Sequence, residues 1–403
     1  MTKVAITGIG IVSGLGAGRE ATWEGMLAGR CAIGPVTAFD ATGYRSQVAA
    51  EVPYGCVQAR RTVLERRRLS RSDQIGLMAA EEAVADAGLL DADLDRSRVG
   101  VLLGAGTADL IRNEEYFFTV LDRGIARARP SSAWNHFSST SGDVIAGRFG
   151  FEGLRACVVA ACSSSTIAIG QAADAIRTGR LDAALAGGTD ALSRLTYSGF
   201  NALRLMDSEP CRPFDRSRSG MNIGEGAGLL VLEEMDRAMR RGAHIYGELA
   251  GYGLACEAFH PTAPEPDGRP VAAVVRMALA DAKTSADAVD HLNAHGTATT
   301  QNDRAEGRGF RAVFGERLAK VPVTSLKSMV GHCLGAAGAV EAAILALTVS
   351  RGVIPPTINH RETDAECEVD VVANAARETR IRCAVSTSLA FGGNDSALVI
   401  RAV

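Results

Sequence analysis

Short apolar runs alternate with amphipathic segments along the whole chain, and this alternation limits the fold more than any other feature. Strands are expected within 2–10 and at 99–103, 156–161, 183–186, 228–232, 292–294, 321–325, 384–387 and 397–400. Helical spacing lies between them, as in 73–87 and 271–282. The alternation predicts an α/β protein with buried sheets.

The two halves of the chain contain similar segments. In the first half, an apolar run that ends at Cys162 leads into a helix of small residues. In the second half, 322–326 leads through His332 into the Ala/Gly-rich segment 334–341. The segment 186–190 likewise resembles 390–395. We expect a duplicated α/β unit forming one body, with the active site between its halves.

Composition limits the functional classes. The chain has 403 residues, a formal net charge of −3 and nine cysteines without a CxxC pair. The charge argues against bulk electrostatic binding of nucleic acid, and the cysteines suggest reduced thiols in the cytoplasm. The N-terminus lacks the pattern of a signal peptide, and no run of about 18 apolar residues predicts a membrane span.

Cys162 stands where the strand-like run gives way to the helix. The positive end of a helix favours a thiolate and can hold an oxyanion beside it. Taken alone, the residue fits a small buried cysteine at least as well. His295 and His332 also follow strand-like runs, and Phe391-Gly392-Gly393 forms a turn whose backbone N–H could be a second oxyanion donor. Each of these has a structural reading when considered singly.

Taken together, these motifs resemble the β-ketoacyl-[acyl-carrier-protein] synthases, most of all the elongating enzymes of fatty-acid and type II polyketide synthesis. The resemblance runs from Val4 to Ile400 and implies the thiolase fold. Two similar βαβαβαββ halves, 1–245 and 246–403, would form a layered αβαβα body that works as a dimer. The motifs that carry it are Ala161-Cys162-Ser163-Ser164, Arg212-Pro213-Phe214-Asp215, Gly224-Glu225-Gly226-Ala227-Gly228, Asn293-Ala294-His295-Gly296-Thr297, Lys327-Ser328-Met329-Val330-Gly331-His332 and Phe391-Gly392-Gly393.

The resemblance implies an acyltransferase that performs a decarboxylative Claisen condensation. Cys162 would take the acyl chain from a carrier protein, with the N–H groups of Cys162 and Phe391 holding the oxyanion. His295 and His332 would then donate hydrogen bonds to the thioester of malonyl-carrier protein. Lys327 matches the lysine that orders the histidine site. No cofactor or metal would be needed, because phosphopantetheine arrives on the carrier protein.

The resemblance also implies contacts with the substrate, and the chain matches the family at some of these positions and differs at others. Thr297 and Thr299 match residues that hydrogen-bond the pantetheine arm, and Phe391 matches an aromatic gate. Thr107 stands where elongating enzymes usually carry a bulky aliphatic residue, and the segment 133–139 also differs. These departures suggest a polar acyl tunnel and leave a specialised polyketide or polyene substrate open beside housekeeping lipid synthesis.

The loop at Phe391 also departs from the family pattern. Ala390 stands where a glycine is usual and should be stiffer. Asn394-Asp395 replaces the usual Thr-Asn that follows the glycines.

Six arginines lie between residues 60 and 71. Composition alone describes a solvated helix face, whereas the resemblance implies a docking patch for an acidic carrier protein, with Arg67 and Arg68 as the best matches.

Three further interpretations concern the assembly and the reaction. The chain could be the catalytic member of a heterodimer with a related subunit, or a homodimer. A non-catalytic chain-length partner would lack the nucleophile, which Cys162 argues against. A thiolase would need a second cysteine near the C-terminus, and Cys383-Ala384-Val385 does not supply its motif.

Overall fold

Two five-stranded sheets of the same topology form the frame of the protein. The computed structural model describes residues 2–107, 110–133 and 137–403. The first sheet has the order β6-β5-β7-β8-β1 and the second β11-β10-β15-β16-β9. The strands of the first are β1 (Val4–Ser13), β5 (Val99–Gly104), β6 (Arg155–Val158), β7 (Ala183–Asp190) and β8 (Gly226–Glu234). Those of the second are β9 (Gly247–Cys256), β10 (His291–Asn293), β11 (Pro322–Thr324), β15 (Cys383–Ser388) and β16 (Asn394–Arg401).

The pairing pattern repeats strand for strand. In each set the first three strands as given run parallel, and the next two pairings are antiparallel. The two-residue strand β13 (Asp370–Val371) adds one more parallel pairing outside β11. A short antiparallel contact, with Ala5 opposite Glu248, joins β1 to β9. The repeated topology confirms the expected α/β duplication. The expected boundary at 245/246 lies between α10 (Met235–Arg240) and β9.

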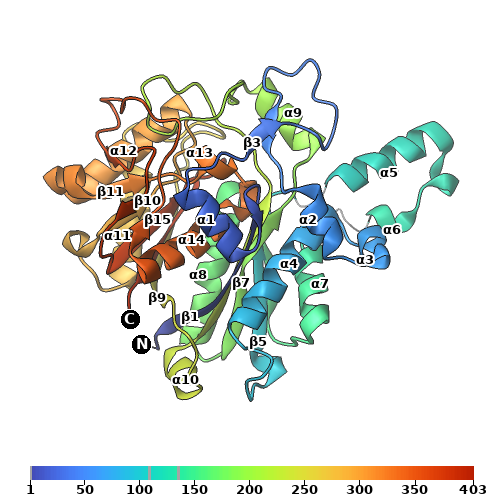
Figure 1. Ribbon diagram of the computed structural model, residues 1–403, viewed down its shortest axis with the longest axis horizontal. Helices are drawn as coiled ribbons and strands as arrows, with labels where there is room; N and C mark the ends of the chain where they lie inside the picture. Colours follow the sequence, from blue (N-terminus) through green and yellow to red (C-terminus); the bar gives the residue numbers. More distant parts are fainter. Residues whose placement is uncertain (1, 108–109, 134–136) are drawn as a thin grey trace.

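The helices α8 (Ser164–Arg177) and α14 (Ala337–Arg351) lie between the two sheets and make contacts with both (Figure 1). On the outer faces, α4 (Arg71–Asp86) covers β1 and β8, and α11 (Arg269–Asp281) covers β9 and β16. The result is the five-layered αβαβα body. Small residues make the central layer possible: a Cβ on Gly228 would lie 2.5 Å from the backbone of Ala339.

The remaining elements surround this frame. The helices are α1 (Arg19–Leu27), α2 (Tyr54–Ala59), α3 (Val63–Arg68), α5 (Leu110–Arg123), α6 (Pro130–Ala133), α7 (Thr140–Phe149), α9 (Arg194–Ala202), α12 (Thr300–Phe314) and α13 (Lys327–Val330). The short strands are β2 (Gly16–Ala17), β3 (Ile33–Pro35), β4 (Val48–Ala50), β12 (Val353–Ile354), β13 (Asp370–Val371) and β14 (Arg377–Glu378). Figure 1 shows α5 extending away from the layered body.

Most expected elements occur close to their expected bounds, with two differences. The run 156–161 stops being a strand at Val158, because the chain turns sharply before Cys162, where Ala161 has φ 48°. The strand β9 was not expected from the sequence; its glycines Gly251 and Gly253 lie against the backbone of α11, which leaves no room for larger apolar side chains.

The central helix α14 and the turn before it form a long apolar segment. The segment Leu334–Arg351 is long and apolar enough to cross a membrane by length and composition, although the sequence suggested no such segment. Of this segment, 89 % is buried inside the protein. Its apolar surface is therefore used for packing between the two sheets.

Candidate active site

Cys162 lies in a sharp turn between β6 and α8. Ala161 adopts the left-handed backbone region, which costs a non-glycine residue about 1–3 kcal/mol unless the surroundings enforce it. The two serines that follow the cysteine supply that support: Ser163 Oγ donates to the carbonyl of Ser388 at 3.0 Å, and Ser164 Oγ donates to that of Ala161 at 2.6 Å. The turn presents the sulfur at the start of the helix, and Cys162 is 7 % exposed.

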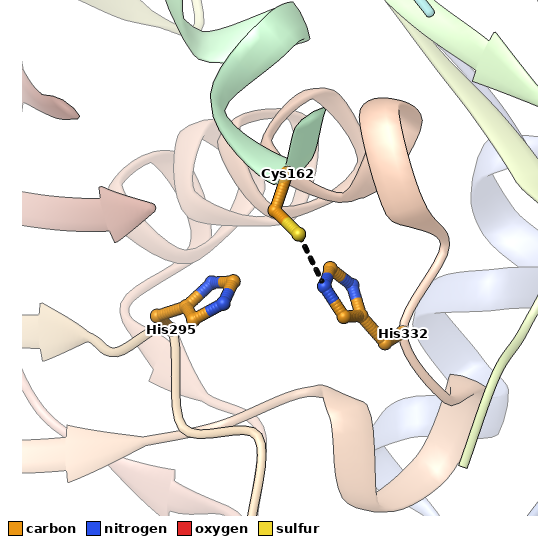
Figure 2. Close-up of side chains that lie close together, drawn as sticks. All are labelled: Cys162, His295 and His332. Carbon is orange, nitrogen blue, oxygen red and sulfur yellow. Dashed lines mark hydrogen bonds between the residues drawn. The ribbon is translucent and has the colours of Figure 1, made fainter. Parts of the chain in front are cut away.

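The structure brings both predicted histidines to this sulfur, as Figure 2 shows. The Nε2 atom of His332 lies 3.0 Å from Cys162 Sγ. The rings of His295 and His332 are 5.2 Å apart at nearly a right angle, and one ligand atom from each of the three residues lies within 4.8 Å of the others. Cys162 is 133 positions from His295 and 170 positions from His332 in the sequence, yet the three side chains meet at one point.

Lys327 determines which nitrogen of His295 carries the proton. Its Nζ lies 3.3 Å from Nδ1 of His295 and forms a buried ion pair with Glu341. A lysine ammonium can only donate, so Nδ1 accepts and the proton resides on Nε2. Because Nδ1 is taken, Nε2–H is the donor left for a substrate in the cavity.

The titration of the site follows from its burial. Burial, with Lys327 adding to it, holds the pKa of His295 and of His332 well below the usual value, so both rings are neutral near pH 7. Burial also raises the pKa of Cys162 to about 12, although Lys327 and the N–H of Phe391 lower it. The helix start favours the thiolate, but desolvation outweighs it here, and the thiol needs a base.

The loop that carries Phe391 closes the site from the other side. Its backbone N–H lies near the Cys162 sulfur and lowers the pKa of that thiol. Its ring stacks on Phe200, with centroids 5.5 Å apart. Gly392 and Gly393 have φ 81° and 74°, a region that favours glycine, so both glycines are required by the turn.

A cavity of about 300 Å³ connects these groups to the surface. Thr297 and Thr299 line it, and their hydroxyl groups are 3.0 Å apart. Thr107 lies elsewhere, beyond the end of β5: its N–H donates to Asp190, and its buried hydroxyl has no hydrogen-bond partner in the described part of the chain. Residues 134–136 of the expected pocket segment lie outside the described residues.

The comparisons with known proteins agree with this geometry. A family model described as "Beta-ketoacyl synthase, N-terminal domain" matches residues 1–238, and one described as "Beta-ketoacyl synthase, C-terminal domain" matches residues 246–361. The chain belongs to the β-ketoacyl synthase family.

Relatives of this synthase include a polyketide synthase subunit and a 3-oxoacyl-[acyl-carrier-protein] synthase. It is 38 % identical over 419 residues to the ketoacyl synthase alpha subunit of the tetracenomycin polyketide synthase of Streptomyces glaucescens, covering 99 % of this chain and 96 % of the relative. It is 35 % identical over 406 residues to 3-oxoacyl-[acyl-carrier-protein] synthase 2 of Synechocystis, covering 99 % and 98 %.

Solved structures of ketosynthases share the whole fold. The ishigamide ketosynthase/chain length factor superposes with a TM-score of 0.94 at 36 % identity, covering 100 % of this chain and 99 % of that one. A type II polyketide ketosynthase in complex with its acyl-carrier protein superposes with a TM-score of 0.93 at 33 % identity, covering 100 % of both chains.

In the arginine-rich segment 60–71 of this synthase, some arginine side chains bind other parts of the protein and others are exposed. Arg61 is buried and paired with Glu81, and Arg71 pairs with Glu225. Arg66 donates to the carbonyl of Gln58. Arg67 and Arg68, in the last turn of α3, are exposed, and within the described residues neither side chain forms an ion pair.

Two buried carboxyl groups escaped the sequence analysis. Glu341 is the partner of Lys327, and Glu306 accepts the backbone N–H groups of His295 at 2.7 Å and Gly296 at 2.8 Å. Thr387 donates its hydroxyl to the same carboxyl at 2.6 Å. Glu306 thus fixes the turn that carries His295. For Glu341 the signal in the sequence was a single acidic residue within the apolar helix α14, which is costly to bury without a partner.

Proposed function

We propose that this synthase joins an acyl group held on Cys162 to a malonyl unit presented by an acyl carrier protein, with loss of CO2. The observation that carries this proposal is the convergence of one thiol, two neutral imidazoles and a backbone N–H on one cavity. Cys162, His295 and His332 are the groups that meet at this point, with one ligand atom of each within 4.8 Å of the others.

In the first half-reaction, Sγ of Cys162 attacks the carbonyl carbon of an acyl thioester. Nε2 of His332, 3.0 Å away, accepts the thiol proton. The backbone N–H groups of Cys162 and Phe391 stabilise the oxyanion. The C–S bond to the pantetheine then breaks, and the pantetheine sulfur leaves with the proton.

In the second half-reaction, His295 and His332 act as hydrogen-bond donors. Nε2–H of His295, held in that tautomer by Lys327, donates to the carbonyl oxygen of the malonyl thioester. Once the sulfur is acylated, His332 takes up a proton from solvent at Nε2 and releases the one on Nδ1, and its Nε2–H then donates beside that of His295. These donors stabilise the enolate that forms when the carboxylate leaves as CO2. The enolate carbon attacks the acyl carbonyl, and the Cys162 sulfur leaves and takes up one proton.

This chemistry needs no cofactor and no metal, and we propose that none takes part. The Cys162–His295–His332 cluster contains ligand types that zinc accepts. However, Nε2 of His332 is hydrogen-bonded to the sulfur, and the Lys327 ammonium beside His295 disfavours a second cation there. We expect condensation to continue unchanged after dialysis against a strong chelator; recovery of a lost rate by added zinc would contradict this.

The expected partners are an acyl carrier protein and a second subunit. Arg67 and Arg68 offer unpaired cations for an acidic carrier protein. The strand β6 is an open edge of its sheet, with Val159 beside it 61 % exposed, and α5 exposes Leu121 at 81 %. An open strand edge next to exposed apolar side chains suits a second subunit, either another copy or a related chain.

Relatives of similar identity act in fatty-acid and in polyketide synthesis, so both pathways remain candidates. A preference for acyl chains with polar groups rests on the sequence departures at Thr107 and 133–139, and Thr107 itself does not line the cavity that contains Cys162. The nine cysteines are all free, which is consistent with a cytoplasmic reaction.

Mass spectrometry of the intact protein after incubation with a panel of saturated and polyenoyl carrier-protein thioesters tests the proposal. We expect one added acyl group in the wild-type protein, none in Cys162→Ala, and one in the control variant Cys56→Ala. Acylation of Cys162→Ala would refute the assignment of the nucleophile. Equal transfer of plain saturated chains would remove the preference for polar ones.

A further inference from the structure

Two carboxyl groups that the mechanism does not use lie on the cavity wall behind the Phe391 loop. Asp395, at the start of β16, is fully buried, and Glu257 directly follows the last residue of β9. Both line the cavity that contains Cys162. The pairing of the two strands places Asp395 opposite Ala255 and Asn394 opposite Cys256, so the two acids are neighbours across the sheet.

No cation neutralises this pair within the described residues. The groups that face Asp395 are Glu257, from the end of β9, and Glu306, from α12, and both add negative charge. Arg204 and His260 line the mouth of the cavity but form no ion pair with either acid. Neither oxygen of Asp395 has a hydrogen bond of good geometry, although the N–H of Ala390 and the carboxyl of Glu257 lie nearby. Two adjacent buried carboxylates cannot both remain ionised at low cost.

The surroundings assign the proton to Asp395. Glu257 is less buried, and its carboxylate accepts the N–H of Glu265 at 2.9 Å, whereas Asp395 is fully buried. Burial and the charge of Glu257 raise the pKa of Asp395 to about 8. Near pH 7 Asp395 is therefore a carboxylic acid beside an ionised partner.

The same residues tie the Phe391 loop to the segment after β9. The N–H of Glu257 donates to the carbonyl of Gly393, and the N–H of Gly392 donates to that of Pro261, both at 2.8 Å. Asp395 faces the N–H of Ala390, and the next N–H along the chain, that of Phe391, lies near the Cys162 sulfur.

We propose that Asp395 is a positioning residue: its protonated carboxyl donates to Glu257 and, through Ala390, holds the Phe391 N–H on the reacting sulfur. When the proton leaves, the two carboxylates repel each other and the loop separates from the segment after β9. An asparagine at this position would donate at every pH. The inference rests on the proposed function only in that the positioned N–H serves acyl transfer.

Infrared spectroscopy of the unacylated protein tests the proton independently of any activity. We expect the carbonyl stretching band of a protonated carboxyl group to disappear between pH 7 and pH 9 in the wild type. Subtracting the spectrum of Asp395→Asn isolates this band, because other buried acids such as Glu306 remain in both proteins. In Glu257→Gln the band should disappear at lower pH, since the neighbouring charge is gone. No band that depends on Asp395 above pH 7 would overturn the proposal.

The rate of acyl transfer from a small pantetheine thioester tests the positioning role. The wild-type rate divided by the Asp395→Asn rate should be constant below pH 7 and fall about tenfold per pH unit above pH 8. The ratio cancels the ionisation of Cys162, which both proteins share. The control Asp267→Asn, an exposed acid in the same segment, should give a constant ratio. A constant ratio for Asp395→Asn, with its infrared band present, would overturn the positioning role while leaving the proposed function intact.

Discussion

At the scale of single residues, the buried ion pair of Lys327 and Glu341 gives the active site its charge balance. The ammonium also contacts Nδ1 of His295, so one side chain links a helix of the central layer to a reacting group. The pair is 2 % and 3 % exposed at its two side chains. Removing one partner therefore leaves a buried charge without compensation.

Variants of Lys327 and Glu341 should separate the effect of this ion pair on stability from its effect on catalysis. Lys327→Met should lower the free energy of unfolding by about 3–5 kcal/mol, because Glu341 loses its partner. The double variant Lys327→Met/Glu341→Leu should recover most of that stability, since two apolar side chains replace the pair. Chemical denaturation measures both values.

Condensation should remain impaired in the double variant, by about 10²–10³-fold, because nothing then holds the Nε2–H tautomer of His295. Initial rates with malonyl- and acyl-carrier protein measure this. A stable double variant with the full wild-type rate would show that Lys327 serves folding alone.

The neutral histidines carry a prediction for pH. Burial keeps the pKa of His295 and His332 well below the usual value, so neither gains a proton as the pH is lowered from 8 to 6. Decarboxylation of a malonyl thioester should accordingly show no acid limb in this range. Release of CO2 measured against pH would contradict the assignment if it fell with a midpoint near 6.5, the value of an exposed histidine.

At the scale of elements, the close approach of β5 to the start of α8 places the nucleophile. A Cβ on Gly104 would lie 2.1 Å from the nitrogen of Ser165 and 2.3 Å from the carbonyl carbon of Ser164. Both are backbone atoms of the helix start, which cannot rotate away as a side chain can.

Gly104→Ala should therefore displace the helix start, lower stability by about 1–3 kcal/mol and slow the acylation of Cys162. Gly147→Ala is the matched control: this exposed glycine in α7 has open space around it, and alanine should stabilise the helix by about 0.5–1 kcal/mol. Thermal unfolding and acylation rates of the two variants measure the difference. If the two variants had the same stability and the same acylation rate, close packing at Gly104 would not be what places the nucleophile.

At the scale of the whole molecule, the free arginines at the end of α3 predict how the carrier protein is recruited. Arg67→Glu/Arg68→Glu should raise KM for carrier-bound substrates, most strongly at low ionic strength, because the attraction is between exposed charges. Steady-state kinetics at two salt concentrations measures the effect.

A small pantetheine thioester should be used equally well by that double variant and the wild type. Arg60→Glu provides a control from the same segment, outside the exposed pair in the last turn of α3. A rise in KM of equal size for the small thioester would contradict docking and indicate damage to the fold.

Much of the protein followed from local sequence patterns. Alternating apolar runs predicted the strands, and the echo between the segments at Cys162 and His332 predicted the duplication. The structure extends that echo: α8 and α14 each begin after a non-glycine residue in the left-handed region, Ala161 and Leu334. These features depend on residues near one another in the chain, so periodicity and turn chemistry reveal them.

The amino-acid sequence by itself determined the duplicated α/β frame, the thiol at a helix start and the two histidines at strand ends. Only the tertiary structure decided that Glu341 neutralises Lys327, that Cys162 rests as a thiol, and that Asp395 meets Glu257. Protonation states and ion pairs depend on burial and on partners brought together from distant parts of the chain. Protonation states and ion pairs are therefore set only when the two sheets pack against the central helices α8 and α14.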